Sequence, residues 1–317
     1  MPIKTHKPNL ALTQKGRTVL VLGATGKQGG AVASALKAGG WLVRALVRNP
    51  DSDAANALAS SGIEVLRGDL SDVTAIRAAM VGIYGVFSMQ PNSGSAGSGV
   101  TDADEIRFGK AVADIAVETG VNHLVYTSAS IVSKGRTGLA NLDCKIEIED
   151  HIRSLSIAST IVRPAAFMNL FVLPGMGLDQ GTFSFFQFPD QPIQVIAVED
   201  IGKIVASIFG DRDRFAGRTI AIAGDEVTGH DLQEILSDAA GHLIAYRRFS
   251  DDLLESNAFL RRNANLFADG RAGANADIPA VKVEFGNLLS LKEWLAGIGK
   301  PLLQAALEAE AQPVALR

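Results

Sequence analysis

The stretch TVLVLGATGKQGG, residues 18–30, decides the fold of this chain. An apolar run (18–22) leads into glycines at Gly23, Gly26 and Gly29, and a helix-like segment follows at once. A strand, a glycine turn and a helix in this order open a dinucleotide-binding fold. The turn needs backbone freedom, the helix N-terminus can bind a pyrophosphate, and a side chain at Gly29 would keep the helix away from the sheet. A plain glycine-rich turn is the alternative interpretation.

The rest of the first half repeats this alternation of apolar strands and helices. The expected strands are 18–23, 41–47, 63–68, 84–89, 123–128 and 158–164. The expected helices are 28–39, 53–62, 72–80, 103–120 and 144–154. Alternating strands and helices indicate βαβ units and a parallel sheet, and continuous apolar strands indicate that helices cover both faces. The predicted fold class is α/β, a Rossmann-type doubly wound parallel sheet.

The second half of the chain is less regular. It contains an amphipathic helix (198–210), a strand that looks like one returning to the sheet (218–224) and a further helix (227–241). We therefore expect an NAD(P)-binding Rossmann domain, residues 1–162, and a smaller C-terminal α/β lobe. This lobe, residues 163–317, would bind a substrate or partner and would cover the carboxyl end of the sheet, with segments returning to it.

Composition and charge exclude several functions. The chain has 317 residues, of which 47% are hydrophobic and 20% charged, and this balance is typical of a soluble globular protein. Its net charge of −4 argues against direct nucleic-acid binding. The single cysteine, Cys144, excludes an internal disulfide, and the five histidines lack metal-ligand spacing, so no metal site is expected.

The location of the protein is also an expectation from sequence. The N-terminal residues lack the apolar core of a signal peptide, and no apolar run approaches the length of a membrane span. We expect a cytoplasmic protein without membrane contact. The N-terminal arm, the loop SGSAGSG (93–99) and the C-terminal LEAEAQPVALR (307–317) are expected to be mobile.

The ends of the second and third strands indicate the cofactor. A fold that prefers NAD usually places an acid after the second strand, to bind the ribose 2′-hydroxyl. This chain has Arg48 there, and a guanidinium suits a 2′-phosphate, so NADP(H) is the expected cofactor. Asp69 and Leu70 follow the third strand and would lie near the adenine. A solvated surface arginine and a helix-starting aspartate remain the alternatives for Arg48 and Asp69.

At this point the motifs, taken in order, resemble the NmrA-like family of atypical short-chain dehydrogenases/reductases. The likeness runs from the first strand nearly to the end of the chain, and the ordered set is more specific than the glycine motif alone. The matching segments are GATGKQGG (23–30), VRNP (47–50), GDL (68–70), the helix that carries Arg107, CKIEIEDHI (144–152), VRPAAFMN (162–169), PIQVIAVEDIG (192–202) and SLKEWL (290–295).

The resemblance implies a set of cofactor contacts. The phosphate loop would run from Ala24 to Gly29, and Arg48 and Asn49 would hold the 2′-phosphate. Gln90 would approach the nicotinamide side, and Phe167 and Asn169 would close over it. The full implied set is Gly23, Ala24, Thr25, Gly26, Lys27, Gln28, Gly29, Arg48, Asn49, Asp69, Leu70, Gln90, Arg107, Lys145, Phe167 and Asn169.

The segment NLDCK (141–145) bears on catalysis. Related reductases place a tyrosine four residues before a lysine, whereas this chain has Asn141 before Lys145. An asparagine amide cannot deliver a proton at neutral pH, and a positioned general acid contributes about two to four orders of magnitude in rate. Lys145 and Ser128 remain the candidate catalytic residues, with a surface lysine and a strand-end hydroxyl as alternatives. Cys144 is either a packed thiol or one whose pKa Lys145 lowers.

Two functions are compatible with these residues. The first is an NADPH-dependent oxidoreductase acting on a small aromatic, quinone or conjugated acceptor, which can take a hydride without a tyrosine acid. The second is a catalytically degenerate NADPH/NADP redox sensor that regulates a protein partner. The run FSFFQF (183–188) either lines an apolar pocket beside the nicotinamide, which favours the enzyme, or forms the core of the lobe.

Overall fold

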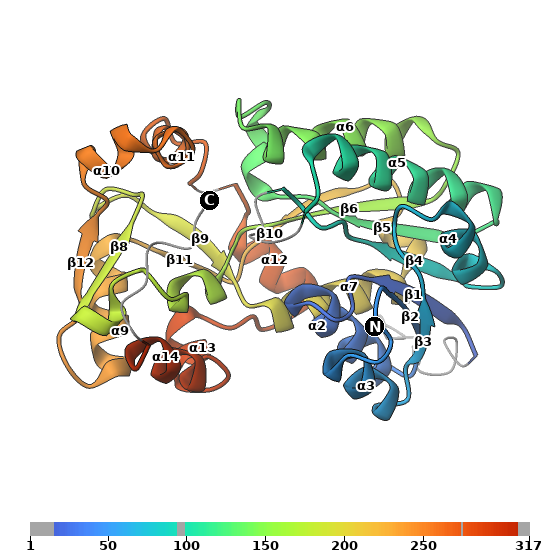
Figure 1. Cartoon of the computed structure of the whole chain (residues 1–317), viewed down its shortest axis with the longest axis horizontal. Coiled ribbons are helices and arrows are strands. Elements are labelled where there is room, and N and C mark those ends of the chain that lie inside the picture. The colour runs from blue at the N-terminus through green and yellow to red at the C-terminus, as the bar shows by residue number, and fades with distance from the viewer. Residues whose placement is uncertain (1–15, 94–98, 274, 310–317) are drawn as a thin grey trace, which may run out of the picture.

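The computed structural model describes residues 16–93, 99–273 and 275–309. Most of the N-terminal arm, the SGSAGSG loop and the C-terminal tail lies outside the described residues. Figure 1 shows two parts: an α/β sandwich that contains the first half of the chain, and a smaller lobe at one end of its sheet.

One parallel sheet forms the centre of the sandwich, and the described residues give it seven strands in the order β10-β6-β5-β4-β1-β2-β3. The strands are β1 (Thr18–Leu22), β2 (Leu42–Val47), β3 (Glu64–Arg67), β4 (Gly85–Ser88), β5 (His123–Thr127), β6 (Ser159–Pro164) and β10 (Thr219–Ile222). The predicted doubly wound α/β fold is confirmed. The last strand, from the second half of the chain, pairs with β6, as its apolar run indicated.

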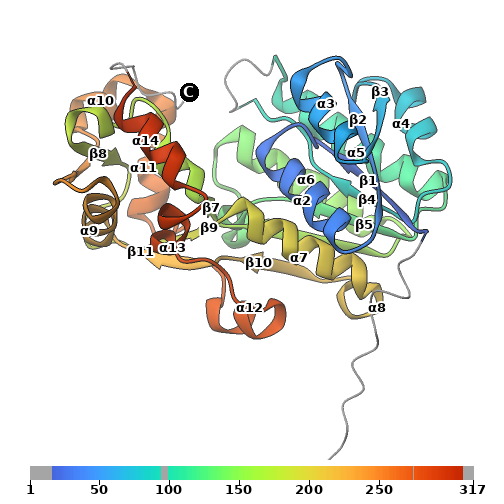
Figure 2. The same cartoon turned by 90° about the horizontal axis from the view of Figure 1, so that it is seen from below.

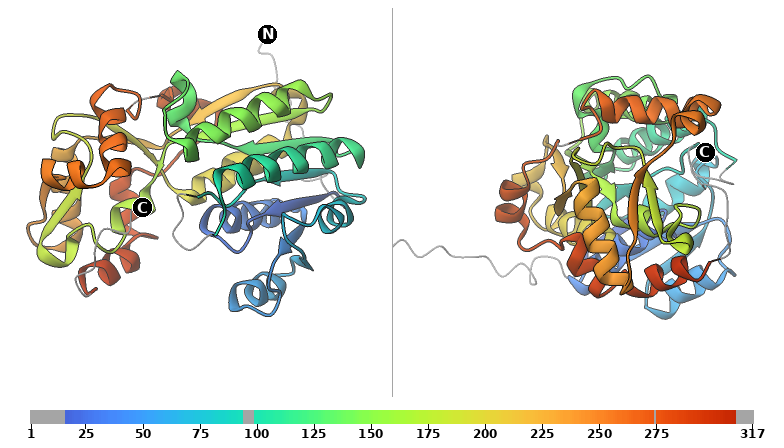
Figure 3. Two further views of the ribbon diagram at one scale, coloured as in Figure 1. Left: turned by 45° about the horizontal axis from the view of Figure 1, so that its top comes forward. Right: turned by 90° about the vertical axis from the view of Figure 1, so that its left-hand side faces the viewer.

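Helices cover both faces of this sheet. They are α2 (Lys27–Ala38), α3 (Asp53–Ser60), α4 (Val73–Met80), α5 (Asp102–Glu118), α6 (Ala140–Ser154), α7 (Val198–Gly210) and α8 (Arg212–Phe215). Alternate side chains of β1 belong to two hydrophobic cores: Val19 and Val21 pack in the core of α2 and α7, and Leu20 and Leu22 in that of α4, α5 and α6. The left view of Figure 3 shows α5 and α6 side by side.

Helix α7 belongs to the sandwich although it comes from the second half of the chain. It runs beside α2, as Figure 2 shows. The two backbones approach closely at Gly202, where a Cβ atom would lie 2.4 Å from the carbonyl oxygen of Ala31. Its apolar face packs Ile201, Ile204 and Ile208 into the core beneath the sheet. The segment from β9 (Ile193–Ile196) to β10 therefore returns the chain from the lobe to the Rossmann layer.

The smaller lobe contains two short sheets, one of β7, β9 and β11 and one of β8 and β12. Their bounds are β7 (Ala166–Phe167), β8 (Thr182–Phe185), β9 (Ile193–Ile196), β11 (Asp225–Val227) and β12 (Ala245–Arg248). The lobe helices are η2 (Met168–Val172), η3 (Leu178–Gln180), α9 (Gly229–Ala240), α10 (Asp251–Ser256), α11 (Ala258–Ala268), α13 (Leu291–Ala296) and α14 (Lys300–Leu307). Trp294 is fully buried in the core of this lobe.

Two further helices of the described residues lie where the lobe meets the sandwich. Helix η1 (Ser130–Lys134) follows β5, and α12 (Ile278–Phe285) packs Phe285 in parallel on Phe215 of the sandwich. The right-hand view of Figure 3 looks onto the lobe, with the Rossmann layers behind it. Because β5 and β6 end facing the lobe, a site at the carboxyl edge of the sheet lies between the two parts.

Candidate functional site

The glycine loop between β1 and α2 has a backbone that side chains would disturb. Gly23 has a φ of +70°, which favours glycine, and Gly26 is the N-cap of α2 without a side-chain capping bond. A Cβ atom at Gly29 would lie 2.2 Å from the carbonyl oxygen of Gly23. The first turn of α2 is tied to the sheet because Gln28 Nε2 donates to Thr127 Oγ1 at 2.8 Å. This turn leaves an uncapped helix N-terminus facing the carboxyl edge, the geometry that suits an anion.

A cleft of about 260 Å³ extends from this loop towards the ends of β2 and β3. Its lining includes Gly23, Thr25, Gly26, Arg48, Asp69 and Leu70 of the expected set. Hydrogen bonds from Ser71 lower the pKa of Asp69, and the positive charges of Arg48 and Arg107 lower it further. The two arginines therefore lie near enough to interact with the Asp69 carboxylate at this end of the cleft.

Some expected residues do not line this cleft. Asn49 is exposed, and its Oδ1 accepts a hydrogen bond from the backbone of Asp51 at 3.1 Å. Ala24 is buried behind the loop. Arg107 pairs with Asp104 at 2.7 Å, and its guanidinium lies 4.5 Å from the ring centre of Phe108. Phe108 itself lines the cleft, so Arg107, which packs on its ring, lies next to the cleft without lining it.

A second cavity of about 500 Å³ lies beyond Met89, which lines both spaces. The expected residues Lys27, Gln28, Gln90, Ser128, Lys145 and Phe167 line it. Gln90 Nε2 donates to Ser88 Oγ at 2.9 Å, and its Oε1 has no partner in the described part of the chain. Asn169, two residues after Phe167, is buried and does not line the cavity. Like Gln90 Oε1, its Oδ1 has no hydrogen-bond partner among the described residues.

Ser128 lies at the end of β5, beside helix α6. Its hydroxyl is close enough to lower the pKa of Glu149, yet it makes no well-formed hydrogen bond within the described ranges. Burial raises the pKa of Glu149, but hydrogen bonds from Arg163 and Arg153, with the nearby Ser128 hydroxyl, outweigh it and hold the pKa below its ordinary value. Ser128 also lines the second cavity.

Lys145 has a buried partner that the sequence analysis missed. Its Nζ lies 2.5 Å from Glu105 Oε1, and the side chains are 12% and 1% exposed. Glu105 lines the same cavity. The signal was in the periodicity of α5, because Glu105 occupies the helical face on which Phe108, Gly109 and Val112 are buried. A carboxylate on an apolar helix face is typical of a paired or functional charge.

Position 141 does not supply a proton donor. Asn141 is half-buried at the start of α6 and does not line the cavity; Leu142 and Lys145 do. Tyr126 lies near Glu105, but it is fully buried in the core, and burial raises its pKa well above the ordinary value. Burial, with the charge of Glu105, also raises the pKa of Cys144 to about 12, so this thiol is packed rather than activated.

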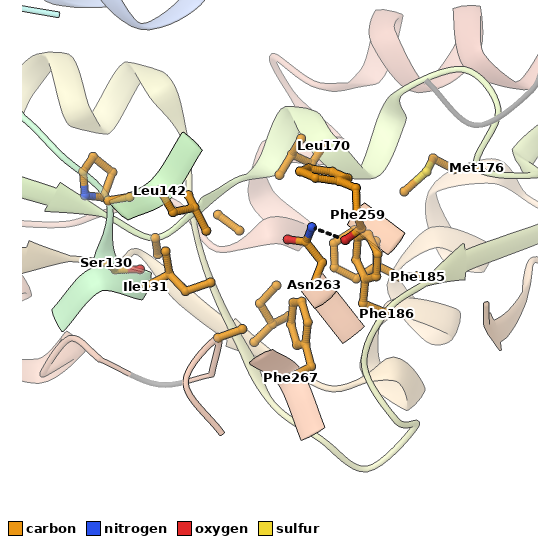
Figure 4. A pocket seen from close by; sticks show the side chains of 16 residues that line it. Ser130, Ile131, Leu142, Leu170, Met176, Phe185, Phe186, Phe259, Asn263 and Phe267 are labelled. Atoms are coloured by element: carbon orange, nitrogen blue, oxygen red, sulfur yellow. Dashed lines mark hydrogen bonds between the residues drawn. The ribbon is translucent and has the colours of Figure 1, made fainter. Parts of the chain in front are cut away.

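A third cavity of about 260 Å³ adjoins the second and is almost entirely apolar. The two share Ala129, Leu142, Pro164–Ala166 and Leu170. Phe185 and Phe186 line it together with Phe259 and Phe267 of α11, as Figure 4 shows. Phe185 and Phe186 thus line an apolar cavity and also belong to the core of the lobe, and the place of this cavity beside a nicotinamide stays a prediction.

Helix α11 and the turn after it are joined to the loop that follows β5. Lys134 Nζ donates to the carbonyl of Gly270 at 2.8 Å, and Arg271 donates to that of Arg136 at 2.9 Å. Arg262 donates to the carbonyl of Gly138. These bonds hold α11 over the aromatic cavity.

Comparison with known proteins identifies the family. The model of the NmrA-like family matches residues 15–274. The chain belongs to the NmrA-like family. This agrees with the resemblance seen in the ordered motifs.

Curated relatives carry the same family name. An NmrA-like family domain-containing oxidoreductase, notA, from Aspergillus sp. (strain MF297-2) is 32% identical over 69% of this chain and 71% of its own length. An NmrA-like family domain-containing protein of Dictyostelium discoideum is 28% identical over 73% of this chain and 80% of its own.

Solved structures share the fold at lower identity. NmrA, described as a negative transcriptional regulator and solved in complex with NADP, gives a TM-score of 0.76 at 22% identity, covering 92% of this chain and 98% of that one. Triphenylmethane reductase of Citrobacter sp., complexed with NADP(H), gives 0.72 at 20% identity, covering 92% and 100%. NADPH-dependent quinone oxidoreductase QOR2 of Escherichia coli gives 0.69 at 23% identity, covering 88% and 99%.

The described residues contain neither a cluster of metal-ligating side chains nor a helix that could span a membrane. No group of three or more metal-ligating side chains lies together in residues 16–93, 99–273 and 275–309. Within the same ranges, no helix is both long and apolar enough to cross a bilayer.

Proposed function

We propose that this chain is an NADPH-dependent oxidoreductase that reduces a small aromatic, quinone or conjugated acceptor. The observation that carries the proposal is that the cavity lined by Lys145 adjoins the aromatic cavity, since both are lined by residues such as Ala129, Leu142 and Leu170. A reductase needs adjoining cavities because the cofactor and the acceptor must touch. The oxidoreductase relatives and the neighbouring triphenylmethane and quinone reductases support it.

The cleft and the second cavity fit NADP(H). Gly23 and Gly26 leave room for a pyrophosphate at the N-terminus of α2. Arg48 lines the cleft and would donate to a 2′-phosphate. Gln90 Oε1 is a buried acceptor without a partner in the described residues, and it suits a ribose or carboxamide donor. The chemistry that this cofactor supplies when bound is hydride transfer. Lys145, oriented by Glu105, can donate to ribose hydroxyls in the cavity.

The residues around Lys145 restrict the acceptor. Asn141 does not line the cavity and Tyr126 is buried in the core, so no phenol among the described lining residues can protonate a simple alkoxide. The one carboxylate among those lining residues, Glu105, is paired with Lys145. A quinone or conjugated alkene spreads the developing negative charge over its own π-system, and water can protonate it afterwards. The aromatic lining of the third cavity suits such flat acceptors.

The test is steady-state NADPH oxidation over matched aldehydes, ketones, quinones and conjugated enones. We expect turnover of quinones or enones and negligible turnover of simple aldehydes and ketones. Robust aldehyde or ketone reduction by the native chain would mean that another residue supplies the proton, and this account of residues 141–145 would be wrong.

A redox sensor that regulates a protein partner is the second candidate. The position of Asn141 away from the cavity favours it, and one structural neighbour is described as a negative transcriptional regulator. The same panel separates the two functions. Tight NADPH binding without turnover of any acceptor would support the sensor and reject the enzyme.

The choice of cofactor gives a separate prediction. Charge-assisted hydrogen bonds contribute about 1.5–3 kcal/mol, so Arg48 should make NADPH bind about tenfold to a hundredfold more tightly than NADH. Arg48→Ala should remove most of this preference. Arg67→Ala is the matched control, because Arg67 ends the neighbouring strand, is exposed and does not line the cleft. Fluorescence titration measures both dissociation constants, and equal values in the native protein would exclude the role given to Arg48.

A further inference from the structure

The aromatic cavity, although mainly apolar, is lined by the polar side chain of Asn263. Among its described lining residues, the polar side chains are Ser130 and Asn263, and none carries a charge. Ser130 lies on the side near Leu142, which this cavity shares with the cavity of Lys145, whereas Asn263 lies among the phenylalanines (Figure 4). A ligand that spans the cavity would therefore meet Asn263 at its far end.

The amide of Asn263 is held in one orientation. Its Nδ2 donates to the backbone carbonyl of Phe259 at 2.9 Å, one turn earlier in α11. Because a carbonyl can only accept, the nitrogen must face Phe259 and the oxygen must point away. Figure 4 shows Oδ1 directed away from Phe259 and towards the side of Ile131 and Leu142. Asn263 thus presents a hydrogen-bond acceptor to a bound molecule.

The surroundings define the rest of the ligand. Phe185, Phe186 and Phe267 line the cavity around Asn263 and offer ring faces and edges rather than flexible aliphatic chains. Aromatic side chains favour stacked or edge-on aromatic partners. A charged ligand would be desolvated here without a counter-charge, since no ionisable side chain is among the described lining residues.

We infer that Asn263 determines specificity, and that the acceptor is a planar, uncharged aromatic molecule with a hydroxyl or N–H donor at the end far from Lys145. This inference rests on the proposed function, which determines that the end of the molecule near Lys145 is the one that reacts. It adds to that function a residue that recognises the other end. A ligand without the donor leaves Asn263 Oδ1 desolvated and unpaired, so the cavity discriminates against it.

The experiment separates recognition from turnover by using ligands that cannot be reduced under assay conditions. With NADP⁺ present at saturation, isothermal titration calorimetry measures binding of 2-naphthol and of 2-methoxynaphthalene. We expect the native protein to bind 2-naphthol about tenfold more tightly. Asn263→Leu should abolish this preference by lowering the affinity for 2-naphthol, which loses its hydrogen bond, and by raising that for 2-methoxynaphthalene, which no longer leaves an acceptor unpaired.

Two further variants complete the design. Asn265→Leu is the matched control, because Asn265 is exposed on the same helix and does not line the cavity; it should keep the native preference. Asn263→Ala repeats the test without adding bulk, and thermal melting verifies that each variant is folded. An unchanged preference in Asn263→Leu or Asn263→Ala, or no binding of either naphthalene to the native protein, would overturn the inference.

The quinone panel is read independently of this titration. Quinone turnover without a preference for 2-naphthol would reject the role of Asn263 and leave the proposed function standing. A clear, Asn263-dependent preference without turnover of any acceptor would support the ligand class and reject the reductase.

Discussion

Changing Gly29 to alanine is expected to reduce NADPH affinity by about a hundredfold or more and to lower the free energy of unfolding by about 1–3 kcal/mol. The added Cβ would lie 2.2 Å from the carbonyl oxygen of Gly23, 2.5 Å from its carbonyl carbon and 2.9 Å from the amide nitrogen of Ala24. All three are backbone atoms, so no rotamer change relieves the clash. Helix α2 must move off the glycine loop, and the loop that would hold the pyrophosphate moves with it.

Gly26→Val is the matched comparison within the same loop. A Cβ at Gly26 would lie 3.4 Å from the Gly23 carbonyl oxygen, an ordinary contact, and Gly26 has a φ of −96°. We therefore expect a folded protein with a nearly native melting temperature that nevertheless fails to bind NADPH, because the side chain blocks the pyrophosphate. Thermal melting and fluorescence titration of both variants measure the two effects. NADPH binding within a few-fold of native in Gly26→Val would show that the phosphate loop is misassigned.

Lys145→Ala is expected to destabilise the protein by about 3–5 kcal/mol, since it leaves the carboxylate of Glu105 buried without its partner. NADPH binding and any quinone turnover should fall together, because Lys145 lines the cavity and acts through cofactor placement. Chemical denaturation measures the stability, and titration measures the binding. Arg107→Ala is the control for stability: its ion pair with Asp104, within α5, is exposed, so its loss should cost less than about 1 kcal/mol.

A double variant separates the two roles of Lys145. In Lys145→Ala with Glu105→Gln, the buried carboxylate is gone, so most of the lost stability should return. NADPH affinity should stay low, because the cavity still lacks the ammonium group. Full recovery of binding in the double variant would show that Lys145 only neutralises Glu105 and does not contact the cofactor.

The sheet was predictable because its signal is local. Each parallel strand is buried on both faces, so it reads as a continuous apolar run, and glycine follows β1 where the chain must turn. Even β10, far along the chain, was recognisable from its apolar run. The start of α6 was less clear: the structure begins this helix at Ala140, whereas the expected segment began at residue 144, because its first turn has no side-chain cap.

The site was predictable only where one residue acts in a known motif. Arg48 and Lys145 follow from position, but the pairing of Lys145 with Glu105 joins residues 40 positions apart on two helices. The aromatic cavity likewise combines Phe185 of β8 with Asn263 of α11. Contacts of this kind depend on how helices and strands pack, and apolar periodicity shows which face is buried but not which partner it meets.

The burial of Cys144 has a consequence for oxidants. The thiolate is the form that attacks peroxides and alkylating reagents, and a pKa of about 12 leaves on the order of one thiolate in 10⁵ at pH 7. Because Cys144 is also the single cysteine of the sequence, cysteine oxidation and disulfide exchange do not provide a switch in the folded chain. A cysteine introduced elsewhere on the surface could in turn be labelled selectively.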